Sequence, residues 1–296
     1  MKTEVIYHLA DIHISSDEER YDEYEKVFEK LYKLLEEEKK EKIVVICGDL
    51  FHEKSGIQSY CIKFCSKFLA KISMYCELIL IDGNHDLNMN NKDNEIKKIS
   101  TIEGVLELLN GIGMNNKFHY LNKNEITRIN GINYGLTTMF SNEITEIENK
   151  KKDELYIGLY HGSVQGSTTD KGYNIKESEN RKITIKEMEK YDLFLLGDIH
   201  RHQFLNKNKT IGYSSSLIQQ NYGENVNGHG LIKWDLKKKQ GEFIEISNEY
   251  CFIQGELINK TLNLHEQIDL SKYKYIRAKI EYSFDKKIDI KKIEKN

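Results

Sequence analysis

Side chains that can bind metal ions recur at five places in this chain, and each place directly follows a short apolar run. The five segments are Asp11-Ile12-His13, Gly48-Asp49, Gly83-Asn84-His85-Asp86, His161-Gly162 and Gly197-Asp198-Ile199-His200. Carboxylate, amide and imidazole groups are the ligands that divalent cations such as Mn²⁺, Mg²⁺ and Zn²⁺ take in proteins. One such segment alone is usually only the start of a loop, whereas all five in this order favour a shared metal site.

The apolar runs before these segments are typical of buried strands. They cover residues 5–7, 43–46, 78–81, 156–159 and 193–196. Parallel strands of an α/β sheet are buried on both faces, so they carry continuous apolar runs. Ligands of such sheets bind outside the carboxyl ends of the strands. We therefore expect the five segments to meet at one edge of the fold.

The mixture of ligand types suits two divalent ions that lie about 3.5–4 Å apart. Asp49 is suited to bridge both ions, because a carboxylate offers two oxygens. The other expected ligands are Asp11, His13 and His200 for one ion, and Asn84, His161 and Asp198 for the other. A hydroxide shared by the two ions would attack a phosphorus atom in line with the departing oxygen.

Two further histidines are candidates for catalysis. His85 is adjacent to an expected ligand without being one, so it is placed to stabilise or protonate the departing oxygen. His52 follows Asp49 by three residues and could contact the substrate phosphate or orient a metal ligand, with simple loop packing as the alternative.

The segments between the motifs predict both helices and hairpins. Apolar residues recur at helical spacing over 20–40 and 57–72, which predicts two helices that cover a sheet. Asn130-Gly131 between two short apolar runs predicts a hairpin, and further hairpins are expected at 203–213 and 229–247. Strands that pair locally in the second half favour a second sheet packed on the first.

Composition sets outer bounds. A chain of 296 residues with 39% hydrophobic content can bury a core for one large domain and an appendage. No run approaches the roughly 20 apolar residues of a membrane span, and we expect no secretory signal before the first strand. The five cysteines show no metal spacing and are expected to be reduced thiols of an intracellular protein. The net charge of −3 speaks mildly against DNA binding by bulk electrostatics alone.

The order of the motifs resembles that of the calcineurin-like metallophosphoesterases. Within them, Gly48-Asp49-Leu50-Phe51-His52 is similar to the nuclease subunit of the SbcCD/MRN double-strand-break repair complexes. Residues 216–224 and His229-Gly230 resemble the SbcD-type exonucleases of phages and large DNA viruses. The similarity covers about residues 4–250. It implies a four-layer αββα sandwich of two mixed sheets at 1–250, with 251–296 as the start of a capping domain or a C-terminal extension.

The resemblance also implies a function. It indicates a Mn²⁺-dependent phosphodiesterase, with Mg²⁺ as the second choice, that cleaves DNA as an exonuclease with some endonuclease activity in repair or recombination. The implied partners are DNA, an SbcC-type ABC ATPase and a second copy of the chain, in the cytoplasm, the nucleus or a viral compartment. A phosphatase of the same superfamily acting on a small molecule or a protein remains an alternative, as does an inactive scaffold for the ATPase.

The chain departs from the family pattern at three positions. Relatives usually have Gly-His-x-His where this chain has Gly197-Asp198-Ile199-His200, so a carboxylate replaces an imidazole. The added negative charge should favour Mn²⁺ or Mg²⁺ over Zn²⁺. Asp82 and Ser214 stand where relatives commonly carry proline, in a sequence that contains none. Other residues must specify those two turns.

Overall fold

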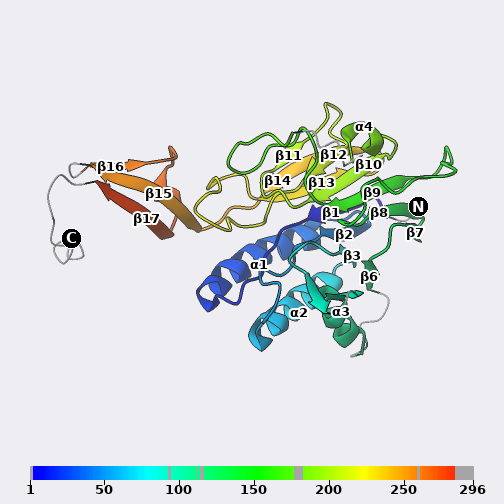
Figure 1. The fold of residues 1–296 in the computed structure, drawn as a ribbon, viewed down its shortest axis with the longest axis horizontal. Coiled ribbons are helices and arrows are strands. Elements are labelled where there is room, and N and C mark those ends of the chain that lie inside the picture. Colours follow the sequence, from blue (N-terminus) through cyan, green and yellow to red (C-terminus); the bar gives the residue numbers. More distant parts are fainter. Residues whose placement is uncertain are drawn as a thin grey trace.

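The computed structural model describes residues 3–92, 95–111, 113, 117–176, 183–258 and 261–283. Two six-stranded mixed sheets pack face to face, and three helices cover the outer face of the first sheet (Figure 1). A smaller three-stranded sheet projects from one end of the sandwich. The predicted fold class, a sandwich of two mixed sheets, is confirmed.

The first sheet has the strand order β14-β13-β1-β2-β3-β6. Its strands are β1 (Val5–Leu9), β2 (Lys42–Cys47), β3 (Glu77–Ile81), β6 (Phe118–Leu121), β13 (Gly230–Asp235) and β14 (Gln240–Glu245). The first four run parallel, whereas β13 is antiparallel to both β1 and β14. The covering helices are α1 (Tyr21–Glu37), α2 (Ser59–Ser73) and α3 (Thr101–Gly111). The two helices predicted at 20–40 and 57–72 are therefore confirmed as α1 and α2.

The second sheet has the strand order β11-β12-β10-β9-β8-β7. Its strands are β7 (Ile126–Ile129), β8 (Ile132–Thr137), β9 (Tyr156–His161), β10 (Leu193–Gly197), β11 (Gln203–Phe204) and β12 (Ile211–Tyr213). Loops and the single-turn helix α4 (Ile185–Met188) cover its outer face, so the fourth layer is thin. The three predicted hairpins are confirmed as β7–β8, β11–β12 and β13–β14, and both Asn130 and Gly131 have a positive φ.

Alternation along the strands builds two cores. Ile6, Val45 and Ile157 point between the two sheets, whereas Tyr7 and Val44 point to the helices. Successive side chains of a strand face opposite sides, so each strand contributes to both cores. Burial of one large apolar side chain stabilises a fold by about 1.5–3 kcal/mol. These two cores fix the strand ends that carry the motif residues.

The small sheet consists of β15 (Tyr250–Ile258), β16 (Thr261–Leu264) and β17 (Tyr275–Ser283). The alternation of residues 275–282 in the sequence predicts a strand there, and β17 confirms it. The small sheet is attached to the start of α1, where Arg277 donates a hydrogen bond of 2.7 Å to the buried carboxylate of Glu23. Its identity as the start of a capping domain stays a prediction. The charged segment 284–296 lies outside the described residues.

The remaining elements are short. A hairpin joins β4 (Leu87–Lys92) and β5 (Glu95–Ser100), and two 3₁₀ helices lie at Glu18–Arg20 and Leu270–Lys272. The five cysteines are buried and unpaired, as expected for reduced thiols. In the described part of the chain, no helix combines the length and the apolar character that crossing a membrane requires.

Candidate metal centre

The five motif segments converge at one edge of the sandwich, as predicted. They follow the carboxyl ends of β1, β2, β3, β9 and β10. Three groups of side chains bring their ligand atoms within 4.8 Å of one another: Asp11, His13 and His200; His13, Asp49 and His85; and Asp11, Asp49 and His161. Because these groups share members, they form one continuous cluster.

The backbone of this cluster is strained. Asp11, His13, Asp49 and Asp198 have φ values of 51°, 48°, 52° and 96°, a region that non-glycine residues rarely adopt. Each such residue costs about 1–3 kcal/mol, and such residues gather at functional sites. Hydrogen bonds between the loops offset this cost: the amide of Asp11 donates to the carbonyl of Gly48, and that of His13 to Asp49, both at 3.0 Å.

Asp49 lies at the centre of the cluster. Its Oδ2 is 3.4 Å from Nε2 of His13, and its Oδ1 is 3.4 Å from Nε2 of His161. The amide of His85 donates to Oδ1 at 2.8 Å. The two carboxylate oxygens thus face imidazoles on opposite sides, as a bridging ligand requires. Gly83 allows this approach, because a Cβ there would lie 2.1 Å from Oδ1 of Asp49.

One side of Asp49 holds Asp11, His13 and His200. Nε2 of His13 lies 3.0 Å from Nε2 of His200, which is 3.8 Å from Oδ1 of Asp11. Glu224 accepts a hydrogen bond of 2.8 Å from Nδ1 of His200. Such a carboxylate fixes the ring and its tautomer, which leaves Nε2 to face the cluster. Glu224 belongs to the segment that resembles exonucleases, but the sequence by itself predicts no role for it.

The other side of Asp49 holds Asn84, His161 and Asp198. Nε2 of His161 lies 3.2 Å from Oδ1 of Asn84 and 4.0 Å from Oδ1 of Asp198. The carbonyl of Cys47 accepts a hydrogen bond of 2.8 Å from Nδ1 of His161, which again leaves Nε2 to face the cluster.

Asp198 lies at the rim of the cluster. Its side chain is 29% exposed, against 4% for Asp49 and 0% for Asp11. One of its oxygens accepts a hydrogen bond of 2.7 Å from Ser163, a contact that the sequence did not reveal. Its backbone amide donates to both oxygens of Asp11 at 3.1 Å. The residue therefore reaches the cluster, although it is absent from the three tight groups.

Burial and mutual charge shift the acid–base behaviour of these groups. Burial raises the pKa of Asp11 to about 7. Burial also acts to raise the pKa of Asp49, but the charges of His161 and His13, together with hydrogen bonds from His161 and the amide of His85, outweigh it and hold that pKa below its usual range. For His200, burial acts to lower the pKa, but the hydrogen bond to Glu224 and the charge of Asp11 raise it to about 10. The carboxylates of Glu224 and Asp11 thus favour the positively charged form of the buried His200.

The donor set fits a pair of divalent cations. Among the ion pairs of the described residues, none brings a lysine or arginine to Asp11, Asp49 or Asp198. Buried carboxylates without such partners are paired with other cations or bind metals. Imidazole nitrogens with carboxylate and amide oxygens, and without thiolates, suit Mn²⁺, Mg²⁺ or Zn²⁺.

Both candidate catalytic histidines lie at this cluster. The ring of His85 is 4.8 Å from the ring of His13, and the ring of His52 is 5.4 Å from it. Nδ1 of His85 donates to the carbonyl of His52, so Nε2 of His85 is available to a substrate. Asp86 does not face the cluster; it accepts hydrogen bonds from the amides of Leu50, Phe51 and Gly83 and so joins two motif loops.

Known proteins are similar to this chain over most or part of its length. The sequence profile of the calcineurin-like phosphoesterases matches residues 5–207. The uncharacterized protein R555 of Acanthamoeba polyphaga mimivirus is 36% identical over 271 residues, which cover 87% of this chain and 19% of that protein. The chain therefore spans about a fifth of the length of that relative. The solved structure of the nuclease MPE of Pseudomonas putida is 16% identical, covering 52% of this chain and 59% of that one, with a TM-score of 0.28.

Proposed function

The chain belongs to the calcineurin-like phosphoesterase family, and on that basis we propose that it cleaves phosphodiester bonds of DNA with two divalent cations. Mn²⁺ is the preferred ion and Mg²⁺ the second choice. The observation that carries the proposal is Asp49, whose two oxygens face His13 and His161 at 3.4 Å each. DNA as the substrate is supported by the resemblance of residues 48–52 and 216–224 to SbcD-type nucleases. The activity would be that of an exonuclease with some endonuclease activity, in repair or recombination.

The cations, when bound, would lower the pKa of water and neutralise charge on the scissile phosphate. The residues proposed to hold them are Asp49 for both ions, Asp11, His13 and His200 for one, and Asn84, His161 and Asp198 for the other. Glu224 and the carbonyl of Cys47 orient the rings of His200 and His161 through hydrogen bonds of 2.8 Å. Such contacts keep the ligand nitrogens directed inward.

His85 is the proposed general acid. Its Nδ1 is engaged by the carbonyl of His52, so the proton for the departing oxygen would come from Nε2. The ring lies beside that of His13, so this proton would be delivered at the edge of the metal cluster. His52 positions His85 through its backbone, and its own ring is proposed to contact the substrate phosphate.

The segment that resembles exonucleases packs directly against the site. The side-chain amide of Gln220 donates to the carbonyl of Ile12 at 3.2 Å, and its backbone amide donates to Glu224 at 2.7 Å. Arg20 donates to the carbonyl of Gln219 at 2.7 Å. This segment thus supports the loop of Asp11 and His13 as well as the partner of His200, which favours a role in the same reaction.

The partners remain proposals from the motif resemblance. They are an SbcC-type ABC ATPase and a second copy of the chain, with β15–β17 as the start of a capping domain. We propose no membrane partner.

Purified protein loaded with Mn²⁺ should cleave linear duplex or single-stranded DNA, and Asp49→Ala should abolish cleavage. Asp153→Asn is the matched control, because Asp153 is exposed and precedes β9 at the end opposite its motif residue His161. Hydrolysis of p-nitrophenyl phosphate without DNA cleavage would contradict the proposal and indicate a phosphatase. Binding of the ATPase without any hydrolysis would favour the scaffold, and Asp198→His should then restore turnover.

A further inference from the structure

A pocket opens beside the Asn84 side of the metal cluster, at the same edge of the sandwich. Its volume is about 400 Å³, and residues at the carboxyl ends of β3, β6 and β8 line it. Pockets for small molecules begin at about 300 Å³. Asp82 in the pocket lies two residues before Asn84, so at most about 7 Å of chain separates them. A group attached to the scissile phosphate could therefore reach this pocket.

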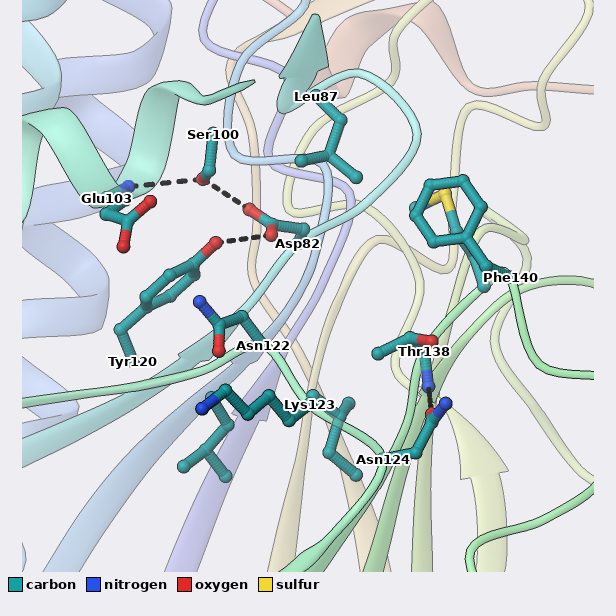
Figure 2. Close-up of a pocket in the computed structure, with 13 residues that line it drawn as sticks. Asp82, Leu87, Ser100, Glu103, Tyr120, Asn122, Lys123, Asn124, Thr138 and Phe140 are labelled. Atoms are coloured by element: carbon teal, nitrogen blue, oxygen red, sulfur yellow. Dashed lines mark hydrogen bonds between the residues drawn. The ribbon is translucent and has the colours of Figure 1, made fainter. Parts of the chain in front are cut away.

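Hydrogen bonds hold one wall of the pocket in place around Asp82. Figure 2 shows Ser100 and Tyr120 directed at its carboxylate, with Ser100 donating at 2.6 Å and the Tyr120 hydroxyl donating to the other oxygen. The same hydroxyl of Ser100 accepts from the amide of Glu103 at 3.1 Å and so caps the start of α3. This wall of the pocket is therefore preorganised.

The rest of the lining combines apolar surface with polar side chains. The apolar residues are Leu87, Leu121, Leu136, Met139 and Phe140. Phe140 is 42% exposed. Figure 2 shows Tyr120, Asn122 and Lys123 across the pocket from Thr138 and Phe140. Among the described residues, no side-chain hydrogen bond or ion pair engages Asn122 or Lys123.

The charges of the pocket argue against a phosphate as its occupant. Asp82 and Glu103 contribute two carboxyl groups, whereas Lys123 contributes one ammonium group at the exposed rim. An uncharged planar group with apolar faces and hydrogen-bonding edges fits this lining better. Nucleobases have this character, because aromatic side chains stack on their faces and amide side chains bond their edges.

We infer that this pocket takes one unpaired nucleobase of the strand that is cleaved. Phe140 stacks on the base, Asn122 bonds its edge and Lys123 contacts the neighbouring phosphate. The inference rests on the proposed function and names the preferred substrate. A paired base must leave its stack to enter, which costs free energy that an unpaired base does not lose. Single strands and frayed ends are therefore preferred over intact duplex.

Binding of small ligands tests the pocket without any cleavage. In calorimetric titration of the Mn²⁺-loaded protein, deoxyadenosine monophosphate should bind about tenfold more tightly than deoxyribose 5-phosphate. Phe140→Ala should remove most of this difference, and Phe140→Trp should keep it. Met74→Ala is the control, because Met74 is 73% exposed and lies at the end of α2, near the opposite edge of the sheet. Equal binding of the two ligands by the unmodified protein would overturn the inference.

Cleavage assays separate this inference from the proposed function. An abasic nucleotide beside the scissile bond should raise KM for a single-stranded oligonucleotide about tenfold, and should cost nothing further in Phe140→Ala. If the abasic substrate and Phe140→Ala each raise KM and their effects multiply when combined, the base binds elsewhere. If bis(p-nitrophenyl) phosphate is hydrolysed but no DNA is cleaved, the proposed function fails, and the ligand titration still decides the fate of the pocket.

Two lysines at opposite ends of β6 form a matched pair. Lys123 follows the strand at the pocket, whereas Lys117 precedes it at the other edge. Each phosphate contact adds about one unit to the slope of log affinity against log salt. Lys123→Ala should lower this slope for single-stranded DNA by about one unit, and Lys117→Ala should leave it unchanged. Equal slopes in both variants would contradict the assigned role of Lys123.

Discussion

Replacement of Glu224 by glutamine should weaken one of the two proposed metal sites. Glu224 is 3% exposed at its side chain and accepts from Nδ1 of His200 at 2.8 Å. The same oxygen accepts from the side-chain amide of Asn221 at 2.7 Å, and the other accepts from the backbone of Gln220 at 2.7 Å. Glutamine retains the shape but offers only one acceptor oxygen, so at least one of these donors loses its partner.

The expected magnitude follows from the loss of a charged acceptor in a buried place. A hydrogen bond to a charged group contributes about 1.5–3 kcal/mol, and every 1.4 kcal/mol is about tenfold in an equilibrium constant. Loss of such an outer contact typically costs about 10–100-fold in metal affinity. The loss should fall on the ion held by Asp11, His13 and His200, because His161 has its own acceptor in Cys47.

Calorimetric titration with Mn²⁺ measures both sites in one experiment. The unmodified protein should bind two ions, and Glu224→Gln should bind one of them about 10–100-fold more weakly. Glu242→Gln is the matched control, because Glu242 is exposed on β14. Two ions bound as tightly as before, in a variant that still melts at the original temperature, would refute the role assigned to Glu224.

Three further changes probe the same cluster. Asp198→His should shift the metal preference from Mn²⁺ toward Zn²⁺, because imidazole replaces a hard oxygen ligand; an unchanged preference in competition titrations would remove Asp198 from the ligand set. Gly83→Ala should lower activity more than tenfold and stability by about 1–3 kcal/mol, because its Cβ would lie 2.1 Å from Oδ1 of Asp49. Denaturant unfolding and turnover like those of the unmodified protein would contradict that contact. Mn²⁺ affinity should fall as the pH drops below about 7, because burial raises the pKa of Asp11 to about 7 and a protonated carboxyl binds metal poorly. Equal affinities at pH 6 and pH 8 would show that Asp11 is not a ligand.

Two turns differ from the family pattern, and the structure shows how this chain specifies them. Asp82 stands where relatives commonly carry proline, and hydrogen bonds from Ser100 and Tyr120 hold it in place. Ser214 is fully buried, and its hydroxyl donates to the carbonyl of Ser215 at 3.3 Å. Side-chain hydrogen bonds can thus replace the fixed φ of proline in a turn.

Helix α3 carried a local signal that was missed. Ser100 and Glu103 have the spacing of a capping box, and Ile102, Val105 and Leu109 follow at helical spacing. All three apolar residues are buried against the first sheet. The sequence therefore contains enough information to predict α3.

The sequence alone determined the five strands that precede the motif segments, three of the hairpins and the meeting of the motif segments at the strand ends. These features depend on local periodicity and on turn residues, as the apolar run before Asp49 and the turn at Asn130-Gly131 illustrate. Only the tertiary structure showed that Glu224 is hydrogen-bonded to His200 and Ser163 to Asp198, and that Asp82 lines the adjacent pocket. Such pairs join loops that are distant in the chain, and the order of strands in the two sheets decides which loops become neighbours. A periodic pattern records which face of a strand is buried, but it carries no information about the strand that lies beside it.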